Sequence, residues 1–231
     1  MKYELNNINK HSPVGIFFDL IIYISVMFLV REIYFQNMTF ITNGLFWSFS
    51  TLIVATWRMK ARGITWKELG LIKPKNFKTL VIATGFLFVF IPISIILFQI
   101  IKDFLPLSLA TDTSSQTTKF GELKGNWLLF FSIIPFIWIQ SMLEELLDRG
   151  FLINWIEKMF SESFLATIFA VLTQATIFGF RHSYDLSERS ITVGLIGLVM
   201  GIAYVLFGRN LWPLIIAHCT LNTLSMLGRV T

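Results

Sequence analysis

Cysteine and charged residues are both scarce in this chain of 231 residues. Cys219 is the only cysteine, which excludes an intrachain disulfide and a metal cluster built from several thiolates. Charged residues make up only 14% of the sequence, against 55% hydrophobic residues and a mean hydropathy of +0.68. So apolar a composition excludes an ordinary soluble domain. It predicts an all-α, polytopic transmembrane helix bundle whose main partner is the lipid bilayer.

Seven apolar runs predict the helices of a single integral-membrane domain that covers residues 1–231. They span residues 14–30, 40–57, 80–101, 127–143, 164–180, 191–207 and 211–227. Most have about the length that crosses a hydrocarbon core. The first run is followed by Arg31 and lacks a small-residue cleavage site, so we expect a retained signal anchor. Asp19 interrupts this run near its start, where an interfacial position is expected.

Basic residues concentrate in the stretch 58–78, which holds seven Lys and Arg residues and Glu68 as its only acid. The positive-inside rule places this loop, and with it the N-terminus, in the cytoplasm. The polar stretch 102–126 is then external. Because the basic residues lie between apolar runs rather than in one long patch, no nucleic-acid partner is expected.

Four ionisable residues close the fourth run: Glu144, Glu145, Asp148 and Arg149. Glu145 and Arg149 are four residues apart, so they share a helix face and can pair. Glu144 is rotated by about 100° from Glu145, which leaves it without a cation of its own and free for chemistry. We expect this motif near the cytoplasmic end of its span. An interfacial salt bridge that ends the helix is the alternative interpretation.

Two later runs carry polar pairs at helical spacing. Phe178 and His182 share one face of the fifth run, and His218 and Asn222 share one face of the seventh. Polar groups in mid-span are costly to bury without partners, which favours a functional cluster that includes Glu144. A carboxylate, two imidazoles and a carboxamide around one point could activate water and stabilise an oxyanion.

Taken in order, these motifs resemble those of the CPBP family, the CAAX proteases and bacteriocin-processing enzymes that are also called the Abi family. The matching residues are Glu144, Glu145 and Arg149, then Phe178 and His182, then His218 and Asn222. The resemblance covers residues 127–227, which we take as the catalytic core, and residues 66–71 resemble a family segment ahead of it. It implies that Glu145 and Arg149 orient the site and that Phe178 packs it. It also implies seven or eight helices, since family members commonly have eight.

The activity implied by the resemblance is that of an intramembrane endopeptidase, a hydrolase of the CAAX type. Glu144 and His182 would activate water, and His218 with Asn222 would hold the oxyanion. The implied substrate is a membrane-associated peptide or protein, and similarity to the bacterial branch implies a bacterial plasma membrane. Bacteriocin processing and non-proteolytic bacteriocin self-immunity or scaffolding are family alternatives, although the intact motifs argue against the non-proteolytic ones.

Whether the site uses a metal is left open by the sequence. Relatives are named metalloproteases, and zinc bound by His182, His218 and Glu144 would keep an open fourth position. A metal-free site gives a role to Asn222, which is a poor zinc ligand. With zinc bound to Glu144, the only other nearby carboxylate is Glu145, and its pairing with Arg149 leaves no separate base. No cofactor is therefore expected, with zinc as the alternative. A small transporter also fits the composition, but it predicts a repeat between the two halves, and none is visible.

Overall fold

The computed structural model describes residues 12–74, 76–104 and 120–231, and throughout these ranges the regular structure is helical, without strands. In chain order the elements are α2 (Pro13–Leu29), η1 (Val30–Glu32), α3 (Phe40–Ala61), α4 (Phe77–Ile101), η2 (Lys102–Phe104), α5 (Trp127–Glu144), η3 (Glu145–Ile153), α6 (Asn154–Met159), α7 (Phe164–Ser183), α8 (Glu188–Leu206) and α9 (Trp212–Val230). The predicted all-α polytopic bundle is confirmed. Most of the stretch 102–126, which was expected to be external, lies outside the described residues.

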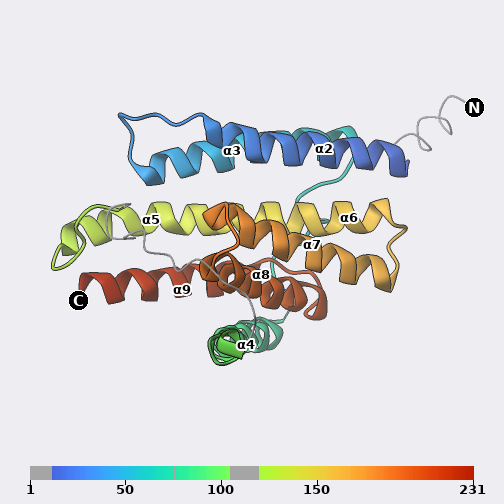
Figure 1. Cartoon of the computed structure of the whole chain (residues 1–231). Coiled ribbons are helices and arrows are strands. Elements are labelled where there is room, and N and C mark those ends of the chain that lie inside the picture. Colours follow the sequence, from blue (N-terminus) through green and yellow to red (C-terminus); the bar gives the residue numbers. More distant parts are fainter. Residues whose placement is uncertain (1–11, 75, 105–119) are drawn as a thin grey trace, which may run out of the picture.

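Six segments of the described chain are long and apolar enough to cross a membrane. They are Pro13–Glu32, Phe40–Ala61, Phe77–Phe104, Trp127–Met159, Phe164–Ser183 and Glu188–Leu206. Their outer faces carry large exposed apolar side chains such as Leu128 and Phe77, which suits contact with lipid. The seventh apolar run forms α9, which is not among these six. Figure 1 shows α9 beside α5, and Met226 and Val230 belong to a buried cluster that includes Phe130.

The fourth run does not end where the sequence indicates. α5, η3 and α6 form one continuous helical segment of 33 residues, Trp127–Met159, which extends along the whole bundle in Figure 1. Glu144 therefore lies near the middle of a long segment, and the expected position near the end of a span is wrong. The helix continues through its charged residues because other elements supply partners for them.

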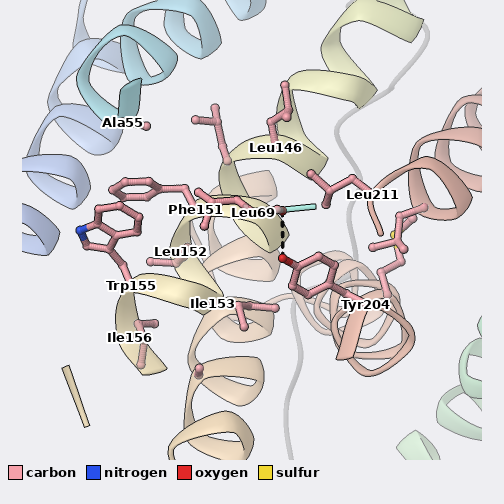
Figure 2. Packing of buried hydrophobic residues seen from close by; sticks show 14 of the residues in the cluster. Ala55, Leu69, Leu146, Phe151, Leu152, Ile153, Trp155, Ile156, Tyr204 and Leu211 are labelled. Carbon is pink, nitrogen blue, oxygen red and sulfur yellow. Dashed lines mark hydrogen bonds between the residues drawn. The ribbon is translucent and has the colours of Figure 1, made fainter. Parts of the chain in front are cut away.

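One end of the bundle is closed by tight packing, shown in Figure 2. The hydroxyl of Tyr204 donates to the carbonyl of Leu69 at 2.9 Å, and the amide of Leu211 donates to the carbonyl of Gly70 at 3.0 Å. Gly70 has φ +99°, and a Cβ there would lie 2.0 Å from the carbonyl oxygen of Arg209, so only glycine fits. These residues fill the space between the loop after α3, α8 and the start of α9. We call this the sealed end.

Asp19 belongs to the same end and is fully buried inside the protein. Arg58 pairs with its carboxylate at 2.6 Å, and Arg62 donates to the other carboxylate oxygen. The indole of Trp155 donates to that oxygen at 3.4 Å. Asp19 therefore ties α2 to the end of α3 and to α6.

Candidate active site

Glu144 is the last residue of α5, and its carboxylate is held by a neighbour one turn earlier. The amide of Gln140 donates to Glu144 Oε1 at 3.0 Å and to the hydroxyl of Ser48, on α3, at 2.8 Å. His218 Nε2 lies 3.7 Å from the second oxygen, Oε2. The carboxylate is thus fixed from one side by an amide and faces an imidazole on the other.

Glu145 and Arg149 form the expected pair, with Arg149 NH1 3.0 Å from Glu145 Oε1 and both side chains fully buried. The same carboxylate oxygen lies 2.7 Å from His218 Nδ1, on α9. Since an ionised carboxylate only accepts hydrogen bonds, Nδ1 of His218 carries a proton and Nε2 faces Glu144. Glu145 therefore orients His218 toward the other glutamate.

The segment Glu145–Ile153 is a π-helix in which all nine residues are buried. Such irregular turns are frequent at functional sites, because they redirect side chains within a continuous helix. Here Asp148 pairs with Arg181, on α7, at 2.6 Å. The motif spacing did not predict this pair. The sequence holds one hint of the pair: Asp148 directly precedes Arg149, and Arg181 directly precedes His182.

His182 lies on α7 with its ring over Phe178, at 4.5 Å between ring centroids. Its Nδ1 is 2.6 Å from the carbonyl oxygen of Phe178. A carbonyl only accepts hydrogen bonds, so Nδ1 donates and Nε2 is the basic nitrogen of the neutral ring. The guanidinium carbon of Arg149 lies 4.4 Å from the Phe178 ring centre, so this ring separates the buried arginine from His182.

Asn222 lies one turn after His218 on α9. Its amide donates one hydrogen bond, of 2.9 Å, to the hydroxyl of Ser141, which itself donates to the carbonyl of Ile137 at 2.9 Å. A carboxamide nitrogen has two hydrogens, so a second donor is available.

These side chains meet at a cavity of about 790 Å³. Of the residues singled out from the sequence, Glu144, Phe178, His182, His218 and Asn222 line it. Glu145 and Arg149 lie behind the wall and reach it through His218 and Phe178. Four arginines also line the cavity, and none was anticipated: Arg31, Arg181, Arg189 and Arg229. They come from the ends of helices, where charge has no periodic pattern that would single them out.

The donors that could hold a metal come from the same residues as the proposed catalytic cluster. In the part of the chain that the structure describes, no group of three or more His, Cys, Asp or Glu side chains is placed to hold a metal ion. Nδ1 of His182 lies against the carbonyl of Phe178 and Nδ1 of His218 against the carboxylate of Glu145, an arrangement that metal-binding histidines also show. We therefore derive no step through zinc, and zinc bound by His182, His218 and Glu144 stays an alternative for experiment.

Comparison with known proteins identifies the segment that carries this site. Residues 126–224 match the model of the family described as type II CAAX prenyl endopeptidase Rce1-like. No curated protein matches the chain, and no solved structure does. The matched segment holds all three motifs, so the match is consistent with the CPBP family of CAAX-type proteases.

Proposed function

We propose that this membrane protein is an intramembrane endopeptidase that hydrolyses a peptide bond of a membrane-associated peptide or protein inside the cavity. The observation that carries the proposal is the meeting of Glu144, His182, His218 and Asn222, from three separate helices, on one cavity. A carboxylate base, an imidazole and two hydrogen-bond donors are what peptide hydrolysis by water requires. The Rce1-like match supports the same reaction class.

Glu144 and His182 activate the water. Glu144 removes a proton as the water oxygen attacks the carbonyl carbon, and Gln140 holds the carboxylate in place through Oε1. His182 contributes Nε2, because its Nδ1–H is donated to Phe178. The proton is then transferred to the amide nitrogen as the C–N bond breaks, which yields a carboxylate and an amine.

His218 and Asn222 stabilise the oxyanion that forms during this attack. Nδ1–H of His218 is donated to Glu145, so Nε2 can donate a hydrogen bond only when the ring is protonated on both nitrogens. The negative charges of Glu145 and Glu144 beside the ring favour this imidazolium form. Asn222 contributes the amide hydrogen that Ser141 does not take. Arg149 holds Glu145 and so acts as a positioning residue.

The charge of the cavity wall favours a substrate that ends in a free carboxylate close to the scissile bond. Arg181 is balanced by Asp148, and Glu188 is balanced by Lys102 at 2.9 Å. Arg31, Arg189 and Arg229 line the cavity as well. A C-terminal peptide presents an anion that arginine binds well. This suits the CAAX type of substrate, which is cut near its C-terminus.

Cleavage of a farnesylated peptide ending in a CAAX box, followed by mass spectrometry, tests the function. The purified wild type is expected to release the C-terminal tripeptide, whereas Glu144→Gln is expected to be inactive while folding normally. Glu122→Gln removes an exposed glutamate outside the cavity and is the matched control. A Glu144→Gln protein as active as the wild type would refute the catalytic assignment.

The metal alternative has its own test. Elemental analysis of the active protein, with activity measured before and after exhaustive chelation, distinguishes the two mechanisms. We expect full activity without stoichiometric metal. Zinc at one equivalent, whose removal stops cleavage and whose return restores it, would make His182, His218 and Glu144 ligands instead.

A further inference from the structure

The cavity belongs to one end of the bundle. On α3 its wall uses Phe40 to Thr51, the first half of the helix. On α8 it uses Glu188 to Met200, and on α9 it uses His218 to Arg229. These halves lie near the α2–α3 turn, the residues before α5 and the α7–α8 loop. We call this the cavity end.

The opposite end contributes nothing to the cavity wall. Among described residues, none from the stretch 55–77, the stretch 157–169 or the stretch 204–217 lines the cavity. The buried side chains of Phe151, Trp155 and Tyr204 fill the sealed end instead, as Figure 2 shows. A substrate therefore cannot reach Glu144 from the sealed end without unfolding that packing.

The two ends differ in basic residues. Among described residues, the sealed end carries Arg58, Lys60, Arg62, Lys67, Lys73, Lys78, Lys158 and Arg209. The described residues of the cavity end carry Arg31, Lys102, Lys124, Arg181, Arg189 and Arg229. The first group is larger, and six of its members lie in the single short stretch 58–78. The positive-inside rule assigns such a loop to the cytoplasm.

We infer that the cavity opens to the extracytoplasmic face and that its substrates are exported peptides presented at the outer surface of the membrane. The catalytic half of this statement rests on the proposed function, whereas the orientation rests on the cavity and the basic loop alone. This proposal differs from the expectation that the Glu144 motif approaches the cytoplasm. Within the Trp127–Met159 segment, the residues that line the cavity are Ile137, Gln140, Glu144 and Leu147.

Cysteine labelling tests the orientation without any need for proteolysis. In a Cys219→Ala background, Leu186→Cys lies in the exposed α7–α8 loop at the cavity end, and Lys67→Cys lies in the exposed basic loop. A membrane-impermeant maleimide added to intact spheroplasts is expected to label Leu186→Cys at once and Lys67→Cys only after the membrane is broken. The reverse pattern would overturn the inference. Glu122→Cys and Lys73→Cys provide a second pair if either variant fails to accumulate.

A vesicle experiment then tests the substrate side. Right-side-out vesicles are expected to cleave an added CAAX-type peptide in the wild type but not in Glu144→Gln, whereas sealed inside-out vesicles leave it intact. Cleavage confined to inside-out vesicles would contradict the inference. If labelling gives the expected pattern and neither preparation cleaves, the orientation stands and the proposed function fails.

Discussion

His218 Nδ1 and Glu145 Oε1 lie 2.7 Å apart and join α9 to the π-helix across 73 positions of sequence. This bond fixes the ring so that Nε2 faces Glu144, at 3.7 Å from Oε2. A buried carboxylate that orients a histidine is worth far more to catalysis than its distance from the substrate indicates.

Glu145→Gln should therefore lower kcat by about 10³-fold or more while changing KM little, because the amide keeps the shape but not the charge. Separate measurement of kcat and KM on the CAAX-type peptide checks this. Glu68→Gln, an exposed glutamate in the basic loop, is the control. A wild-type kcat in Glu145→Gln would show that His218 is not held by its charge.

Arg149→Ala should destabilise the protein by about 3 to 5 kcal/mol, because it leaves the fully buried Glu145 without its cation. Lys158→Ala breaks a pair of the same i,i+4 spacing with an exposed partner, Glu162, and should cost less than about 1 kcal/mol. Thermal unfolding in detergent compares the two. Equal melting temperatures for both variants would contradict a structural role for the Arg149 charge.

Gly179→Ala should separate α7 from α8 and displace His182. A Cβ at Gly179 would lie 2.4 Å from the carbonyl oxygen of Ser190 and 2.9 Å from the backbone of Gly194, so the helices must move apart. Overpacking of this kind costs about 1 to 3 kcal/mol. Gly85→Ala is the matched control, because nothing lies within 4 Å of its Cβ. The melting temperature and kcat should both fall in the first variant and stay unchanged in the second.

Arg229→Gln should raise KM about 10-fold for a peptide with a free C-terminal carboxylate, since a charge-assisted hydrogen bond contributes roughly 1.5 to 3 kcal/mol. The same peptide with an amidated C-terminus should show no change. Lys124→Gln, at the same end but outside the cavity wall, is the control. An equal effect on acid and amide would mean that Arg229 does not bind the substrate carboxylate.

The fold class and the members of the site follow from the sequence, because both depend on local spacing. Apolar runs mark the helices, and intervals of four residues place His218 with Asn222 and Glu145 with Arg149 on common faces. The continuity of the Trp127–Met159 segment could not be predicted in the same way. Four charges in six residues ordinarily end an apolar helix. They are tolerated here because partners distant in sequence, Arg181 and His218, neutralise them.

The arginines of the cavity wall were missed for a related reason. Arg31, Arg189 and Arg229 lie near helix ends, where a basic residue ordinarily marks only the membrane boundary. Only the packing of α2, α8 and α9 around α5 shows that they face a common space.

The central claim is that Glu144 and His182 act as one unit on one water, and the rates of two single variants and the double variant test it most directly. Residues that act together lose their contributions together, so kcat/KM for Glu144→Gln with His182→Ala should lie within about 10-fold of the worse single variant. If the fold-losses in kcat/KM of the two single variants multiply in the double variant, the two residues act independently. That result would contradict the account.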